Sequence, residues 1–176
     1  MSKYVRVMDG VKSNAGGFDY KIDEVNVASN WNPKADTPEE FGGFNFGVED
    51  KILRWLHRGD TLYDVIVPED AEVILVDEEK GVYRSNKIIV TNPRQITDDM
   101  VLELYLKNTL SNKIIAQCLL TLTWRNRLNI SKYIIKDRVN TDNAEEILNE
   151  FIKYAGEDNL KYDSVKEIIS DIKKEM

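Results

Sequence analysis

The spacing of apolar residues along the chain changes near residue 95. Before that point, apolar and polar residues alternate in short runs rich in Val, Ile, Tyr and Phe, a pattern typical of β-strands. These runs predict strands at residues 3–8, 17–22, 24–28, 42–47, 61–67, 71–76 and 82–90. The last three runs are joined by short polar loops, so we expect them to form an antiparallel meander.

One helix is predicted within this first half, at residues 48–58. Glu49 and Asp50 fall in its first turn, where the helix dipole favours negative charge. Helical spacing gives it one apolar face, made of Val48, Ile52, Trp55 and Leu56. Trp55 is therefore expected in the core, whereas Trp31, in the loop-like stretch "SNWNPKAD", is expected to contact a partner.

From residue 96 onward the apolar residues recur at helical spacing. Thr97 is the predicted N-cap of the first of these helices, and a second helix is predicted to begin near Ser111. Tyr133 and Tyr154 are expected on the inward faces of later helices. Those later amphipathic stretches lie at residues 130–139, 143–156 and 162–176. No strand is expected beyond residue 110.

Together these patterns predict an α+β fold in two parts. Residues 1–95 are expected to form a β-rich α/β portion, with a mixed, mainly antiparallel sheet and one helix. Residues 96–176 are expected to form a helical portion that shares the same core. The composition, 42% hydrophobic and 31% charged, is that of an ordinary folded protein.

The net charge of −7 argues against broad, nonspecific binding of nucleic acid, but the charge is uneven along the chain. Residues 107–138 carry seven Lys and Arg side chains against Asp137 alone, which gives +6. This basic segment either faces acidic parts of the same fold and solvent, or it forms a site for a partner.

The single cysteine, Cys118, lies in an apolar stretch and cannot form an internal disulfide. It is therefore expected to be buried and inert. The opening "MSKYVRVMDG" does not resemble a signal peptide, and the apolar stretches fall short of the roughly 20 residues that a membrane span needs. We expect a cytoplasmic protein that does not bind a membrane.

The glycines of "GGFNFG" do not have the spacing of a phosphate-binding loop. Glu49 and Asp50 would also oppose an anion at the start of the following helix. Gly42 and Gly43 are instead expected to allow close approach of neighbouring backbone, with Phe44 on one face of a strand. Phe46 is expected on that same face.

Residues suited to catalysis are scarce in this sequence. His57 is the only histidine, and no cysteine lies near it, so a typical zinc site is not expected. No serine-nucleophile motif is present, and the carboxylates of "PEDAEVILVDEE" are expected in solvated turns. We expect no metal.

The stretches "GGFDYKIDEVNV" and "FGGFNFGVEDKILRWLHRGD", followed by a charged meander that ends in "NKIIV", resemble a known pattern. It is that of small uncharacterised domains from phages and mobile elements, and it covers about residues 4–95. The order of elements is also similar to ADP-ribosyltransferase-like folds. That second resemblance implies that Arg6, Phe44 and Phe46 hold NAD, although "YRSNKIIV" lacks the acidic residue such enzymes use to stabilise positive charge.

The leading functional hypothesis is a noncatalytic binding protein, an accessory or anti-defence inhibitor of a phage or mobile element that blocks a host protein or nucleoprotein complex. An acidic surface can occupy a site made for nucleic acid. The candidate residues for binding a partner are Trp31, Trp124, Arg125, Arg127, Lys132 and Lys136.

Two alternatives remain. One is an ADP-ribosyltransferase-like enzyme that uses NAD to modify a macromolecule. The other is a nucleic-acid-binding module in which the basic helices contact phosphate and aromatic rings stack on bases. In that module the phosphate contacts would be Arg125, Arg127, Lys132 and Lys136, and the stacking ring would be Trp124 or Tyr133.

Overall fold

The structure is a computed structural model that describes residues 3–12 and 17–174. The chain divides into two compact units. The sheet unit comprises Met1–Ile52 and Arg58–Ile96, and the helical unit comprises Leu53–His57 and Thr97–Met176. The fold is α+β, with a sheet in the N-terminal half followed by helices. That the two portions share one core stays a prediction.

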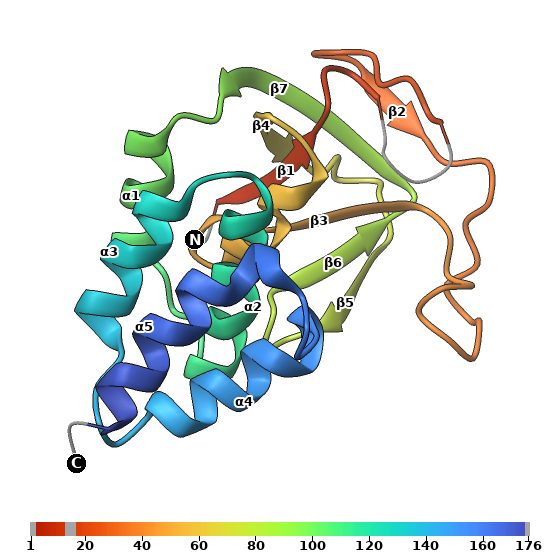
Figure 1. Ribbon diagram of the computed structural model, residues 1–176. Coiled ribbons are helices and arrows are strands. Elements are labelled where there is room, and N and C mark those ends of the chain that lie inside the picture. Colours follow the sequence, from red (N-terminus) through yellow and green to blue (C-terminus); the bar gives the residue numbers. More distant parts are fainter. Residues whose placement is uncertain (1–2, 13–16, 175–176) are drawn as a thin grey trace. The chain divides into compact units, whose positions relative to one another are not determined.

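The sheet unit holds, among its described residues, a seven-stranded sheet in the order β2-β7-β4-β1-β3-β6-β5 (Figure 1). Every neighbouring pair in this order is antiparallel. The strands are β1 Tyr4–Met8, β2 Val25–Val27, β3 Phe44–Val48, β4 Thr61–Ile66, β5 Val73–Asp77, β6 Val82–Ser85 and β7 Lys87–Gln95.

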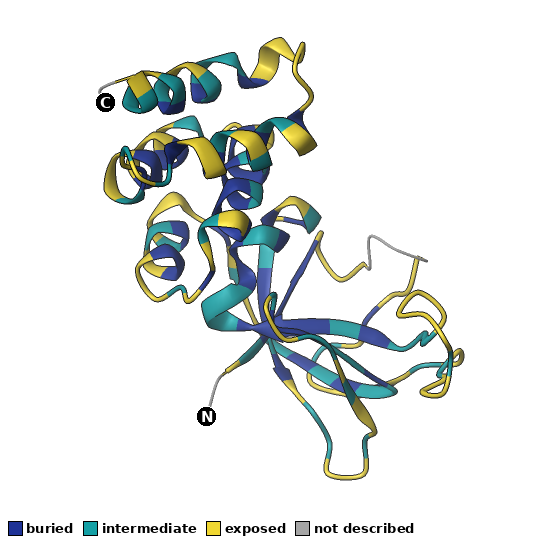
Figure 2. Cartoon of the chain, turned by 90° about the horizontal axis from the view of Figure 1, so that it is seen from below, coloured by how far each residue is buried: buried dark blue, intermediate teal, exposed yellow. Residues whose placement is uncertain are grey.

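Alternation along the strands places a cluster of buried side chains on one face of the sheet. It contains both Phe44 and Phe46 of β3, as the sequence predicted, and Tyr63 of β4. In Figure 2 the buried residues of this unit follow the central strands. The other members of the cluster are Met8, Tyr20, Val65, Ile88 and Val90.

The run at residues 17–22 does not form the predicted strand. It makes isolated bridges only, at Asp19 and at Ile22, and Asp23 then turns the backbone with a φ of 60°. Tyr20 is nevertheless buried. The apolar pattern of this run therefore reflects side chains that enter the core from an irregular segment, because alternation records burial and not hydrogen bonding.

The predicted meander is confirmed for the antiparallel pairing of β5 with β6 and is wrong for β4, which does not continue into it. The run at residues 82–90 breaks at Asn86 into β6, which pairs with β3 and β5, and β7, which pairs with β2 and β4. Ser85 Oγ lies 2.8 Å from the Lys87 carbonyl oxygen and accepts from the Lys87 backbone nitrogen at 3.2 Å, which holds the corner. β4 lies between β7 and β1 and does not pair with β5. Alternation predicts which face a residue occupies but not which strand lies beside it.

The predicted helix of the first half is a 3₁₀ helix, η1, at Glu49–Arg58, and Val48 belongs to β3. Ile52 and Trp55 are buried, as predicted. Three residues per turn align Ile52 with Trp55, which the predicted apolar face also held together. Leu53 and Leu56 are aligned in the same way, and both are buried.

The helical unit consists of helices, and no described residue after Gln95 lies in a strand, which confirms that prediction. In it α2 packs against α3 and α4, and α5 packs against α3 and α4. No helix in the described part of the chain is long and apolar enough to cross a membrane. The helices are α1 Asp98–Leu106, α2 Asn112–Trp124, α3 Leu128–Arg138, α4 Ala144–Ala155, η2 Leu160–Tyr162 and α5 Asp163–Lys174.

The predicted helix starts are confirmed, but two predicted inward side chains are not. The Thr97 hydroxyl accepts a hydrogen bond from the Met100 backbone nitrogen at 3.2 Å, and Ser111 is the N-cap residue of α2. Tyr133 and Tyr154 are 45% and 50% exposed, respectively. Their hydroxyl groups allow a tyrosine to stay at the edge of an apolar stripe, so helical spacing alone overestimates their burial.

Candidate functional site

The sheet unit contains a cavity of about 380 Å³, which we call the arginine pocket. Its cations are Arg6 of β1, Arg58 at the end of η1, and Arg84 of β6. Among the described residues that line it, Glu39 is the one acid, so cations outnumber acids three to one. Its other lining residues are Phe18, Tyr20, Ala28, Ser29, Asn30, Gly42, Gly43, Phe44 and Asn45.

Arg6 reaches the pocket because β1 and β3 pair over only part of their length. The last pair of their ladder is Val5 with Gly47, and Nη1 of Arg6 then donates a hydrogen bond to the carbonyl oxygen of Asn45. The guanidinium carbon lies 4.9 Å from the centroid of the Tyr20 ring. Burial lowers the pKa of Arg6, and the nearby Tyr20 acts in the opposite direction. An anion bound in the pocket would offset part of the free-energy cost of removing the Arg6 guanidinium from water.

The backbone of Gly42 and Gly43 forms part of the pocket wall, together with the side chain of Arg84. Nη1 of Arg84 donates to the Gly42 carbonyl oxygen at 3.0 Å, and burial lowers the pKa of Arg84. A Cβ atom at Gly42 would lie 1.7 Å from the Asn30 carbonyl oxygen, and one at Gly43 would lie 2.6 Å from that of Ser85. Both glycines also have a positive φ. The prediction that these glycines allow close backbone approach is confirmed.

Three aromatic rings form a second wall of the arginine pocket. The ring centroids of Phe18, Tyr20 and Phe44 lie 4.9 to 5.3 Å from one another. The structure therefore brings together two of the three residues nominated for NAD, Arg6 and Phe44. Phe46, the third, is fully buried in the core of the sheet unit and does not line this cavity.

Sequence reasoning missed Arg58, Arg84 and Glu39 as pocket residues. Arg58 ends a helix, Arg84 lies in a strand and Glu39 lies in a loop, and none of them belongs to a recognisable motif. The one local signal was a cation among the apolar residues of the run at 82–90. Their convergence depends on strand order, which the sequence did not predict.

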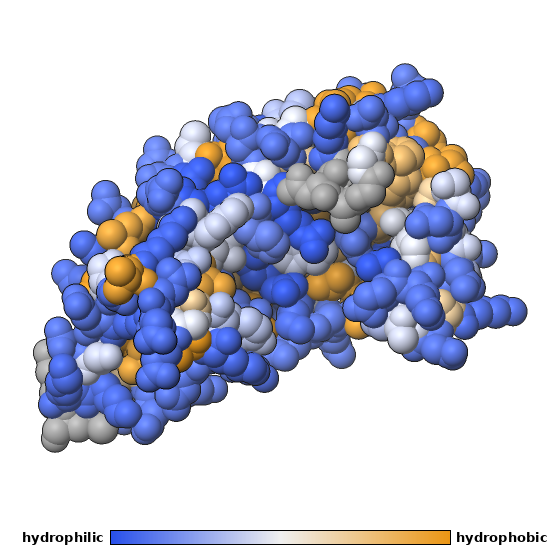
Figure 3. Space-filling view, turned by 45° about the vertical axis from the view of Figure 1, so that its right-hand side comes forward, coloured by the Kyte–Doolittle hydropathy of each residue, from blue (hydrophilic) through white to orange (hydrophobic). Residues whose placement is uncertain are grey.

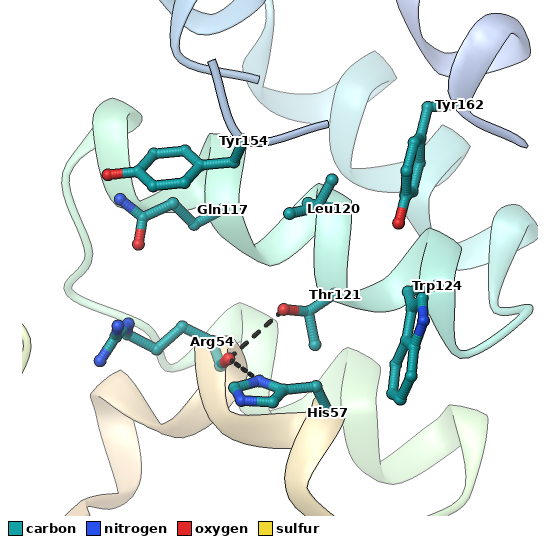
Figure 4. Close-up of a pocket in the computed structure, with 8 residues that line it drawn as sticks. All are labelled: Arg54, His57, Gln117, Leu120, Thr121, Trp124, Tyr154 and Tyr162. Atoms are coloured by element: carbon teal, nitrogen blue, oxygen red, sulfur yellow. Dashed lines mark hydrogen bonds between the residues drawn. The ribbon is translucent and has the colours of Figure 1, made fainter. Parts of the chain in front are cut away.

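The helical unit contains a second cavity of about 380 Å³, which we call the aromatic pocket (Figure 4). Thr121 Oγ1 donates to the Arg54 carbonyl oxygen at 3.4 Å, and Nδ1 of His57 lies 2.9 Å from the same oxygen. The pocket is lined by Arg54, His57, Gln117, Leu120, Thr121, Trp124, Tyr154 and Tyr162. Of the candidates for binding a partner, only Trp124 lines it.

Two of the basic candidates make contacts within the helical unit. Nη2 of Arg125 donates to the His57 carbonyl oxygen at 2.8 Å, and Arg127 forms an ion pair with Asp98. These contacts agree with the interpretation that the basic segment partly faces its own fold.

Lys132 and Lys136 are exposed on α3, and the described residues give neither of them an ion pair. Trp31 is half-buried in the sheet unit, where its indole nitrogen donates to the Glu72 carboxylate. Trp31 thus belongs to a different unit from the other five candidates. The face seen in Figure 3 is mainly hydrophilic, with small hydrophobic patches.

The two residues best suited to nucleophilic or acid–base chemistry lie in the helical unit. Cys118 is fully buried, and burial raises the pKa of its thiol to about 12, so the reactive thiolate does not form near neutral pH. His57 is exposed at the aromatic pocket. In the described part of the chain, no group of three or more His, Cys, Asp and Glu side chains could hold a metal ion.

No family model matches the sequence, no curated protein is significantly similar to it, and no solved structure matches its fold. The chemistry of the two pockets therefore carries the functional argument.

Proposed function

We propose that this chain is a noncatalytic binding protein whose sheet unit recognises an anionic group of its partner in the arginine pocket. The observation that carries the proposal is the convergence of Arg6, Arg58 and Arg84 on one cavity, where Glu39 is the one acid among the described lining residues. Guanidinium groups suit this role because they bind carboxylate and phosphate with two parallel hydrogen bonds.

A binding role also fits the placement of the nucleophilic and titrating side chains. Cys118 is buried in the helical unit, and His57 lines the aromatic pocket rather than the arginine pocket. Apart from the Glu39 carboxylate, the arginine pocket thus offers cations, backbone groups and aromatic rings, which hold a ligand in place.

For the partner we propose a host protein or nucleoprotein complex that presents a carboxylate or phosphate. The resemblance of residues 4–95 to phage and mobile-element domains supports an accessory or anti-defence inhibitor. The net charge of −7 supports a protein partner over direct, nonspecific binding of nucleic acid.

Thermal unfolding in the presence of inorganic phosphate or pyrophosphate tests the proposed site. A ligand that binds only the folded state raises the melting temperature, and we expect pyrophosphate to do so in a concentration-dependent way. Arg84→Gln should weaken this effect about tenfold or more, because it removes a charged hydrogen-bond donor. Lys34→Gln, on an exposed loop of the same unit, is the matched control. Equal responses of the wild type and Arg84→Gln would refute the proposal.

An ADP-ribosyltransferase-like activity remains a second candidate, because Arg6, Phe44 and Glu39 line the same cavity. Glu39 offers the carboxylate that the run at 82–90 lacks, although it lies in a loop. Calorimetric titration with NAD and an assay for transfer of labelled ADP-ribose test this candidate. We expect no tight binding of NAD, and transfer that Glu39→Gln abolishes would make the chain an enzyme.

A further inference from the structure

Three aromatic side chains from separate elements converge on the aromatic pocket. Trp124 ends α2, Tyr154 lies near the end of α4, and Tyr162 belongs to η2. Trp124 and Tyr154 are 49% and 50% exposed, whereas Tyr162 is 6% exposed. Leu120 completes an apolar lining of the kind that holds planar rings.

Cationic groups flank the Trp124 ring of this lining, while at Gln117 the amide nitrogen donates to the Glu150 carboxylate at 3.4 Å. The guanidinium carbon of Arg125 lies 5.1 Å from the centroid of the Trp124 ring, and Nζ of Lys161 lies 5.9 Å from it. Lys161 is held there by a 3.0 Å hydrogen bond to the Trp124 carbonyl oxygen. Arg54 lines the pocket itself. A positively charged ligand would meet like charges here, so the pocket does not suit the quaternary ammonium groups that aromatic cages bind.

We propose that the aromatic pocket binds a small molecule that carries a planar aromatic ring and a negatively charged group. Figure 4 shows the Arg54 guanidinium and the Gln117 amide at one end of the pocket, and Trp124 with Tyr162 at the other. The ring packs against Trp124 and Tyr162, and the anionic group points to Arg54. This site is independent of the arginine pocket, because all of its lining residues belong to the helical unit.

The charge preference is tested with three probes that share one ring system. They are 2-naphthoate, the neutral 2-naphthalenemethanol and the cationic 2-naphthylmethyl-trimethylammonium. Isothermal calorimetry gives the affinities, and the indole N–H signal that Trp124→Phe removes from the NMR spectrum reports the location. We expect naphthoate to bind about tenfold more tightly than the alcohol, with the cation weakest. Adenosine monophosphate, as a fourth probe, distinguishes a phosphate on a nucleobase from a carboxylate on a ring.

Single substitutions test which residue binds the anionic group of the ligand and which binds its ring. Arg54→Gln should remove the advantage of naphthoate over the alcohol, while Trp124→Ala should weaken both about tenfold. Lys113→Gln removes one charge from an exposed position of α2 outside the pocket and should change neither. Tighter binding of the cation, or no shift of the Trp124 signal with any probe, would overturn the proposal. The order of the three probes on the wild type decides the matter even if Arg54→Gln fails to fold.

Discussion

The tryptophans illustrate how differently one residue type is used within this chain. Trp55 is 5% exposed in η1, as its spacing predicted, whereas Trp124 is 49% exposed. Trp55→Ala should lower the free energy of unfolding by about 3–5 kcal/mol, because it leaves a large cavity in a packed region. Urea denaturation followed by far-UV circular dichroism measures this loss.

Trp124→Ala is the control for that measurement, because it removes the same side chain from a half-exposed position. We expect it to cost less than half as much, since a smaller apolar area returns to water. Equal losses for the two variants would contradict the assignment of Trp55 to the core.

A comparison of Gly42 with Gly17 separates the stability cost of a left-handed backbone conformation from the cost of a steric contact. Their φ angles are +64° and +65°, but a Cβ atom at Gly42 would overlap the backbone of Asn30, whereas one at Gly17 would have no atom of the described residues within 4 Å. Gly17→Ala should therefore cost about 1 kcal/mol, the strain of a left-handed residue. Gly42→Ala should cost about 1–3 kcal/mol more, because Asn30 must move. Thermal unfolding of both variants tests the difference, and similar losses would show that the close approach is unimportant.

At this scale the sequence predicted burial better than it predicted the candidate site. Trp55, Phe44 and Phe46 were placed correctly by spacing, because spacing reports which face of an element is apolar. Arg58 and Arg84 were not anticipated, because their convergence requires strands and loops that lie far apart in the sequence.

At the scale of elements, a hydrogen bond joins two helices of the helical unit. The buried Tyr105 of α1 donates its hydroxyl to the Asp137 carboxylate of α3 at 2.6 Å. Tyr105→Phe should lower the free energy of unfolding by about 1–2 kcal/mol at neutral pH, because a hydrogen bond to a charged group is lost. Chemical denaturation at pH 7 measures this loss.

The same contact predicts a dependence on alkaline pH. Burial, then the hydrogen bond to Asp137, raise the pKa of Tyr105 above its ordinary value. In the unfolded chain the Tyr105 hydroxyl loses its proton near pH 10, while in the folded chain it keeps the proton to higher pH. The contribution of Tyr105 to the free energy of unfolding is therefore complete well below pH 10 and is lost progressively as the pH rises above 10. Melting temperatures between pH 8 and 11 should therefore fall less for Tyr105→Phe than for the wild type. Parallel curves would show that Tyr105 does not cause the loss.

The strands show where local sequence stops determining structure. Six of the predicted runs contain strands, but the run at 17–22 is irregular. The run at 82–90 is interrupted at Asn86 and forms two strands, β6 and β7, which pair with different neighbours in the sheet. The side-chain hydrogen bonds of Ser85 at that turn depend on tertiary context. Alternation is a local property, whereas β4 finds its neighbours β1 and β7 through contacts distant in the chain.

At the scale of the whole molecule, a chain of net charge −7 contains a basic segment of net charge +6 at residues 107–138, seven cations less one acid. Arg127 is paired with Asp98, and Arg125 donates to the His57 carbonyl oxygen. These contacts favour a stabilising role within the helical unit. In a surface that binds nucleic acid, the side chains of Arg125 and Arg127 would instead be available to contact phosphate.

Reversal of both arginines to Glu distinguishes these roles. Arg125→Glu with Arg127→Glu should lower the free energy of unfolding by about 1–2 kcal/mol, because a hydrogen bond is lost and Asp98 then faces a like charge. Lys34→Glu with Lys113→Glu makes the same change in net charge at exposed positions and should stay within about 0.5 kcal/mol of the wild type. Thermal melts measure the stability of both double variants. Fluorescence anisotropy of a labelled single-stranded oligonucleotide, at two salt concentrations, measures their binding of nucleic acid. An unchanged melting temperature with loss of salt-sensitive binding in the arginine variant would instead make the basic segment a nucleic-acid contact, since phosphate contacts weaken as salt rises.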